Sequence, residues 1–203
     1  MNNQAVYQRS TISYLLLSAL MAAVCAVCSW ISVPLPFTPV PINLGTLAVF
    51  LAGGILGRRY GSISVIVFVL LGAAGLPVFH GFTGGIGIIT GPTGGYITGY
   101  IVAAFLTGIV TDTYFKSHAG DAGCVTEENA DKSRAAAYIA LALSMVLGLA
   151  ACYALGTAWF MYISKTDFKA ALIMCIVPFL PGDAVKITAA AVLVRKLRPF
   201  VRR

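Results

Sequence analysis

The chain has 203 residues, of which 59% are apolar and only 10% are charged, and its mean hydropathy is +0.88. Soluble domains carry about 25% charged residues, so this composition indicates an integral membrane protein with no room for a second, soluble domain. The net charge is +7. Because the bases cluster at the ends of apolar runs, they resemble membrane-topology signals and not a nucleic-acid-binding surface.

Apolar runs, interrupted by Pro, Gly and charged residues, predict an all-α integral membrane fold in one domain, 1–203, with six spans. The second span is short, because a helix over its 14 residues up to Leu56 is about 21 Å long, less than the ~30 Å hydrocarbon core. A bundle with short spans is expected to enclose a space. The predicted spans are 13–33, 43–57, 61–77, 92–114, 134–161 and 170–196.

The first predicted span carries small residues at a spacing of four. On a helix this spacing places small residues on one face, where another helix can approach closely. Packing within the bundle and docking to a separate subunit are both compatible with the pattern. The residues concerned are Ala19, Ala22, Ala23 and Ala26.

The distribution of Lys and Arg predicts the orientation of the chain. With both termini in the cytoplasm, the outer side keeps only two bases, Lys165 and Lys169, against eleven on the inner side. This is the asymmetry of the positive-inside rule. The eleven are Arg9, Arg58, Arg59, Lys116, Lys132, Arg134, Arg195, Lys196, Arg198, Arg202 and Arg203.

The connections between spans differ in chemistry. The outer loops 34–42 and 78–91 are almost free of charge and rich in Pro, Gly and aromatic residues, among them Phe37, Phe79 and Phe82. Such loops are interpreted as lids over a ligand site, although loops that merely rest in the membrane interface would look the same. The only long polar stretch, 116–134, is expected to be a solvated cytoplasmic connector.

A glycine-rich segment precedes and enters the fourth predicted span. Residues 81–100 contain eight glycines in twenty positions, which allow the backbone to approach a ligand or a neighbouring helix closely. Pro92 suits the first turn of the span, and Thr93 and Tyr96 add hydrogen-bonding side chains. Helix packing is the expected role of Gly99 and Gly108.

Asp183 and Lys186 stand in the last predicted span, three residues apart, so on a helix they share a face. Pro178 and Pro181 are expected to interrupt this span, with Asp183 as the N-cap of the helix that follows. An interruption at membrane depth normally lines a cavity. Leucine would fill a structural role at lower cost than two charges, so the pair is interpreted as a ligand-binding feature, although a cap with an internal ion pair is the alternative.

Enzymatic activity is not expected. The two histidines, His80 and His118, lie in connections, and the spans hold no His–carboxylate ligand set for a metal and no serine in a protease-like setting. The sequence also lacks the G-x-x-x-x-G-K-[ST] phosphate loop of an ATPase. Neither metal nor cofactor is predicted.

Three segments resemble the BioY family, the biotin-binding S components of energy-coupling factor (ECF) transporters. They are "ISVPLPFTPVPINLGTLAVFLAGGILG" (31–57), "LLGAAGLPVFHGFTGGIGIITGPTGGYITGY" (70–100) and "PFLPGDAVK" (178–186). The resemblance covers most of the chain. It implies a six-helix S-component fold that captures biotin near the outer surface of a bacterial plasma membrane, with biotin as transported substrate and no cofactor.

The resemblance also implies a site and partners. Asp183 and Lys186 match the family's P-G-D-x-x-K and are expected to contact biotin, at either its ureido group or its carboxylate, with Asn43 and Thr46 as further polar candidates. The expected pocket wall comprises Phe79, Gly84, Gly85, Gly91, Thr93, Gly94, Gly95 and Tyr96. The alanine face of the first span resembles the surface that docks on a transmembrane coupling subunit (EcfT-like), which acts with ABC-type ATPases.

Two other modes of transport are compatible with the residues. The chain could transport biotin alone, without a coupling subunit or ATPases. An ion-coupled secondary carrier for a small acidic metabolite, with Asp183 as its proton site, is the alternative from another transport class.

Overall fold

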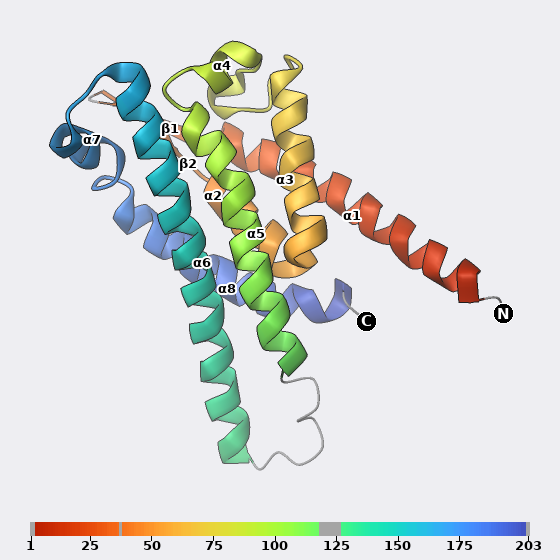
Figure 1. Ribbon diagram of the computed structural model, residues 1–203. Coiled ribbons are helices and arrows are strands. Elements are labelled where there is room, and N and C mark those ends of the chain that lie inside the picture. The colour runs from red at the N-terminus through yellow and green to blue at the C-terminus, as the bar shows by residue number, and fades with distance from the viewer. Residues whose placement is uncertain (1–2, 37, 118–126, 202–203) are drawn as a thin grey trace.

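A computed structural model describes residues 3–36, 38–117 and 127–201. The chain is mostly helical, with a short hairpin after its first helix (Figure 1). The elements are α1 (Asn3–Trp30), β1 (Ser32–Leu35), β2 (Thr38–Asn43), α2 (Gly45–Leu51), the π-helical turn η1 (Ala52–Leu56), α3 (Gly57–Ala73), the 3-10 turn η2 (His80–Phe82), α4 (Ile86–Thr90), α5 (Gly94–Ser117), α6 (Glu127–Ser164), α7 (Phe168–Cys175) and α8 (Leu180–Val201).

Among the described residues, four helical runs are long and apolar enough to cross a membrane. A bent pair, α7 with α8, becomes a fifth if it is counted as one span. The predicted helical membrane fold is confirmed, whereas the division into six spans stays a prediction. The four runs are Thr11–Trp30, Gly45–Ala73, Gly94–Ser117 and Ala135–Ser164.

The run Gly45–Ala73 reverses direction at Gly57. This glycine has a φ of 78°, a conformation that L-residues with a side chain rarely adopt. After the reversal α3 lies against η1, and a Cβ at Gly61 would overlap the carbonyl oxygen of Ala52. Two short helical arms therefore stand where the sequence predicts the second and third spans.

The proline-rich connection after α1 forms a hairpin, which the all-α prediction did not include. Strands β1 and β2 pair antiparallel, with Ser32 opposite Asn43 and an irregularity between Val33 and Leu35. In a two-stranded sheet both strands are edges, where Pro is tolerated because no second neighbour needs its missing N–H. Phe37, predicted as part of a lid, lies outside the described residues.

The last predicted span is interrupted, as its prolines indicate. Helix α7 ends at Cys175, α8 begins at Leu180, and the two are bent by 50°. The predicted N-cap role of Asp183 is wrong: its backbone N–H donates to the carbonyl oxygen of Phe179 at 2.9 Å, so it already lies inside the first turn of α8. Pro181 fits this turn because its missing N–H would have no intrahelical partner there.

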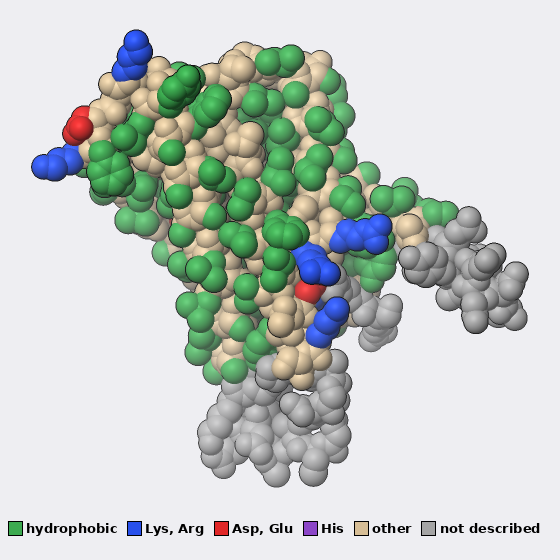
Figure 2. All heavy atoms as spheres, in the orientation of Figure 1, with side chains coloured by type: hydrophobic (Ala, Val, Ile, Leu, Met, Phe, Trp, Pro, Cys, Tyr) green, Lys and Arg blue, Asp and Glu red, His purple; other side chains and the backbone are tan. Residues whose placement is uncertain are grey.

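The predicted connector 116–134 is shorter than expected, because α5 continues to Ser117 and α6 begins at Glu127. The face drawn in Figure 2 is covered by apolar side chains, with Lys and Arg near one edge and in a second group at the opposite end. Apolar surface between two charged levels is the pattern expected of a protein surrounded by lipid.

Candidate functional site

A cavity lies between α5, α6, α8, the hairpin and the α3–α4 connection. Its lining combines aromatic and aliphatic side chains with a few polar groups, the composition typical of small-molecule sites. The lining residues are Ser29, Val40, Pro41, Asn43, Thr46, Phe68, Phe79, His80, Thr93, Tyr96, Ile97, Tyr100, Leu149, Cys152, Tyr153, Cys175, Phe179, Asp183 and Lys186.

The most polar part of this cavity is a buried ion pair on one face of α8. Lys186 Nζ lies 2.9 Å from Asp183 Oδ1, and the two residues are only 6% and 3% exposed. Thr46, in the first turn of α2, joins them: Lys186 Nζ donates to its Oγ1 at 3.2 Å, and the hydroxyl lies 3.4 Å from Asp183 Oδ1. The i,i+3 spacing thus brings the two charges together as the sequence predicts.

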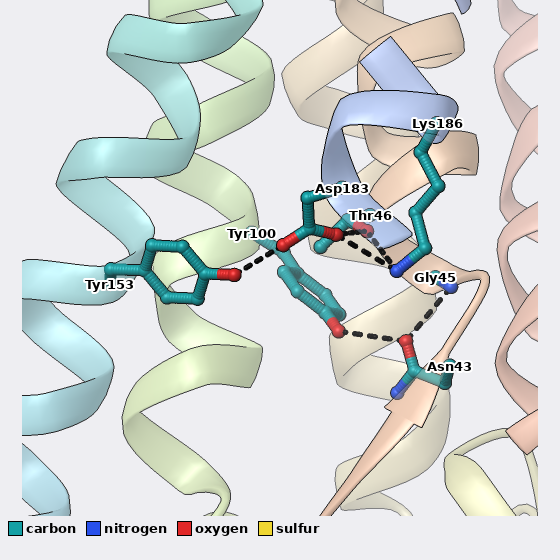
Figure 3. A network of polar contacts seen from close by, with 7 residues as sticks. All are labelled: Asn43, Gly45, Thr46, Tyr100, Tyr153, Asp183 and Lys186. Carbon is teal, nitrogen blue, oxygen red and sulfur yellow. Dashed lines mark hydrogen bonds and ion pairs between the residues drawn. The ribbon is translucent and has the colours of Figure 1, made fainter. Parts of the chain in front are cut away.

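A tyrosine from α6 completes the coordination of the carboxylate (Figure 3). The hydroxyl of Tyr153 donates to the second oxygen of Asp183, Oδ2. Three groups from three helices therefore point at one carboxylate: Tyr153, Lys186 and Thr46. An ionised carboxylate is an acceptor at both oxygens, and this set of donors on both oxygens matches that form.

Asn43 forms a second polar contact beside the ion pair. Its Oδ1 accepts hydrogen bonds from the backbone N–H of Gly45 at 2.9 Å and from the hydroxyl of Tyr100 at 3.3 Å. Two donors on the same atom identify it as the oxygen. The amide nitrogen is then a donor directed elsewhere, and Asn43 lines the cavity. Lys186 likewise has three N–H donors, two of which serve Thr46 and Asp183. The cluster can offer N–H groups to a ligand.

The predicted aromatic and threonine members of the pocket wall also reach the cavity. Phe79 is 1% exposed and packs edge-on to Phe68, with ring centroids 5.5 Å apart. Thr93 and Tyr96 line the cavity from the start of α5, and the hydroxyl of Tyr96 is hydrogen-bonded to Thr157 at 3.1 Å. Phe82, in contrast, is exposed, stacks on Trp30 and is not among the residues that line the cavity.

The predicted glycines are not among the residues that line the cavity. They act behind the lining, where several of them let neighbouring segments pack closely. Gly94 and Gly95 allow α5 to contact Ile89 and Trp159, where a Cβ would overlap. Gly84 packs on the backbone of Leu76, Gly85 adopts a φ of 99°, and the carbonyl oxygen of Gly91 accepts a hydrogen bond from Trp159 Nε1 at 3.0 Å. Gly99 and Gly108 have the predicted packing role, against Cys152 and Arg58.

The alanines of α1 do not share one environment. Ala22 and Ala26 are 3% and 7% exposed and belong to the core, which makes them unsuitable for docking in this conformation. Ala19 and Ala23 are exposed. They lie on the same helix as Leu16 and Leu20, which are more than half exposed.

Several cavity residues were not predicted from the sequence: Ser29, His80, Tyr100, Cys152, Tyr153 and Cys175 line the cavity. Tyr100 had a usable signal, because it follows Tyr96 by four residues and so shares its helix face. Tyr153 had none. It stands in an apolar helix without a recognisable motif, and it contacts Asp183 because of how α6 is oriented about its own axis.

Comparison with known proteins identifies the family. "Biotin transporter BioY" of Thermotoga maritima is 36% identical over 184 residues, 91% of this chain and 95% of that protein. The same-named protein of Lactococcus lactis subsp. cremoris is 33% identical over 198 residues, 97% and 93% of the two chains. A solved structure, the S-component for biotin from an ECF-type ABC transporter, has a TM-score of 0.79 and 30% identity, covering 98% of this chain and 95% of that one. The sequence pattern of the BioY family matches residues 1–203, and the chain therefore belongs to the BioY family.

Proposed function

We propose that this chain is the biotin-binding S component of an ECF-type ABC transporter, a transport protein and not an enzyme. The observation that carries the proposal is the buried Asp183–Lys186 pair, which faces a cavity lined by aromatic side chains. Biotin has an apolar bicyclic ring and an aliphatic arm, with a ureido group at one end and a carboxylate at the other. An apolar cavity with a few convergent polar groups suits such a molecule.

The charge of the cluster favours the ureido group over the carboxylate as its ligand. The Lys186 ammonium is already neutralised by Asp183 at 2.9 Å, so a ligand carboxylate at Lys186 would lie close to a second anion in a region of low dielectric. The ureido group is neutral and offers one carbonyl acceptor and two N–H donors. Lys186 and the amide nitrogen of Asn43 can donate to the former, and Asp183 can accept from the latter.

Titration of the detergent-solubilised protein with biotin tests the proposal. The wild type is expected to bind one biotin per chain, and Asp183→Asn or Lys186→Met to weaken binding by more than about tenfold, roughly 1.4 kcal/mol. Asp167→Asn and Lys169→Met, which make the same changes at exposed positions, are matched controls that should bind like the wild type. No binding by folded wild type would contradict the biotin assignment and favour an ion-coupled carrier.

We further propose that the partners are a transmembrane coupling subunit and ABC-type ATPases, with biotin capture by this chain. The exposed α1 face with Ala19 and Ala23, flanked by Leu16 and Leu20, is the proposed coupling surface. Ala19→Leu with Ala23→Leu should reduce co-purification with the coupling subunit while biotin binding persists. Retained co-purification would exclude this face, and biotin uptake in cells without the other subunits would show transport by this chain alone.

We propose a bacterial plasma membrane location with both termini in the cytoplasm. The support is the positive-inside rule: Arg58, Arg59 and the bases at the end of α8 would share the inner side, and Lys165 and Lys169 the outer side. A single cysteine introduced at either terminus, in a chain whose five native cysteines are replaced, should react with an impermeant thiol reagent only after the cells are opened. Reaction in intact cells would reverse the orientation.

A further inference from the structure

His80 lines the cavity, and its imidazole carries a polar atom without a hydrogen-bond partner among the described residues. This atom, Nε2, is buried. Native proteins leave few buried polar atoms unpaired, because each such atom has lost its hydration without replacement, and each one calls for an explanation.

The backbone around His80 is held in place by its neighbours. The carbonyl oxygen of His80 accepts hydrogen bonds from the N–H and the hydroxyl of Thr83, at 3.4 and 2.8 Å. Phe79 pairs with Thr83 on the other side of the turn, and its ring fits against Gly72, where a Cβ would overlap it. The turn is therefore anchored on both sides of His80, which fixes the point from which its imidazole extends.

His80 and the Asp183–Lys186 cluster approach the cavity from different elements. Tyr100, whose hydroxyl contacts Asn43 of the cluster, lies almost two turns inside α5. His80 belongs instead to the connection between α3 and α4, which lies at the same end of the bundle as the beginning of α5 (Figure 1). A ligand that reaches from the cluster toward this connection would present its far end to His80.

The chemistry of the imidazole fits an acidic end of the ligand. Burial lowers the pKa of His80, so at neutral pH the ring is uncharged, with one N–H and one lone pair. Hydrogen bonds in which one partner is ionised are the stronger ones, and an N–H group at Nε2 would find such a partner in a carboxylate.

We propose that His80 Nε2 donates a hydrogen bond to the carboxylate of bound biotin, at the end of the ligand remote from Asp183 and Lys186. This inference rests on the proposed function and on the ureido group occupying the Asp183–Lys186 cluster. It assigns a ligand contact to a residue for which the sequence indicated only a place in an outer loop.

Titration of three variants with two ligands tests the inference. His80→Leu keeps a side chain of similar bulk but removes the hydrogen bond, and it should bind biotin about tenfold more weakly, the scale of one hydrogen bond to a charged group. His80→Gln can still donate and should retain most of the affinity. Phe82→Leu, in the same turn but exposed, is the matched control and should bind like the wild type.

Biotinamide, in which a neutral amide replaces the carboxylate, identifies the ligand atom. The wild type should bind biotinamide more weakly than biotin, whereas His80→Leu should show little difference between the two. Equal biotin affinity of the wild type and His80→Leu would overturn the inference, and so would an equal loss for both ligands. Absence of biotin binding by the wild type would instead contradict the proposed function, so the two failures are distinguishable. The melting temperature of each ligand-free variant verifies that it is folded.

Discussion

Helix α8 carries two ion pairs, one near each end, and their surroundings differ. The pair Asp183–Lys186, called the outer pair after the proposed orientation, stands in the first two turns and faces the cavity, which Asn43 also lines. The inner pair joins Arg198, about 22 Å along the helix from Asp183, to Asp112 Oδ1 at 2.8 Å. Arg198 is 3% exposed, donates to the carbonyl oxygen of Gly54 and lies over the ring of Phe115.

The difference indicates which pair serves a ligand. The inner pair joins α8 to α5, to η1 and, through the Arg58 N–H donated to Asp112 Oδ2 at 3.1 Å, to the reversal at Gly57. Its partners are protein groups that hold helix ends together. The outer pair leaves donors directed at a cavity, so the same chemistry is available for recognition. The structural role and the ligand-binding role are therefore distinguished by the groups that surround each pair and not by burial.

The largest effect on stability is expected at the inner pair. Arg198→Met leaves Asp112 without its guanidinium and the Gly54 carbonyl without its donor, and breaking a pair that is largely buried costs up to about 3–5 kcal/mol. Thermal or denaturant unfolding in detergent should show this loss. Lys196→Met, an exposed base on the same helix, is the control. A loss no larger than in the control would place Arg198 outside the structural network.

A smaller effect is expected in the glycine-rich wall. Gly95→Ala introduces a Cβ that would overlap Trp159, and overpacking of this kind costs about 1–3 kcal/mol. Gly87→Ala is the control, because a Cβ there meets nothing within 4 Å. If Gly95→Ala lowered biotin affinity at unchanged stability, the glycine would contact the ligand and the wall interpretation would be wrong.

The smallest effect is expected from a single hydroxyl at the outer pair. Tyr153→Phe removes one donor from Asp183 Oδ2, which is worth about 1.5–3 kcal/mol for a bond to a charged group when no substitute is found. Because the carboxylate faces a cavity that can admit water, part of this is recovered, and we expect biotin affinity to fall about fivefold, roughly 1 kcal/mol. Titration with biotin measures the change. Tyr138→Phe, on the same helix but outside the cavity lining, is the matched control, and equal affinities of the two variants would remove Tyr153 from the site.

Local patterns were sufficient for part of this account. The prolines around Phe179 predicted the interrupted last span, and the three-residue spacing predicted that Asp183 and Lys186 meet. The charge-free loop 34–42 gave no sign of a hairpin, because its prolines favour extended backbone without indicating a pairing partner.

Contacts between distant segments could not be read from spacing. Tyr153 and Asp183 are thirty residues apart, and Arg198 and Asp112 are eighty-six apart. The positive-inside rule counted Arg198 as one of the cytoplasmic bases, so nothing in the sequence pointed to its ion-pair partner, Asp112. Only the packing of α8 against α5 and α6 places these side chains together.

Biotin titration of two matched double variants tests the central claim most directly. Asp183→Asn/Lys186→Met and Asp112→Asn/Arg198→Met each neutralise both members of one ion pair, so neither leaves an isolated charge. The account predicts that the first loses biotin binding by more than about tenfold while it remains folded, and that the second, once folded, binds biotin with the affinity of the wild type. Undiminished binding by the first variant, or an equal loss in both, would contradict the assignment of the outer pair to the substrate.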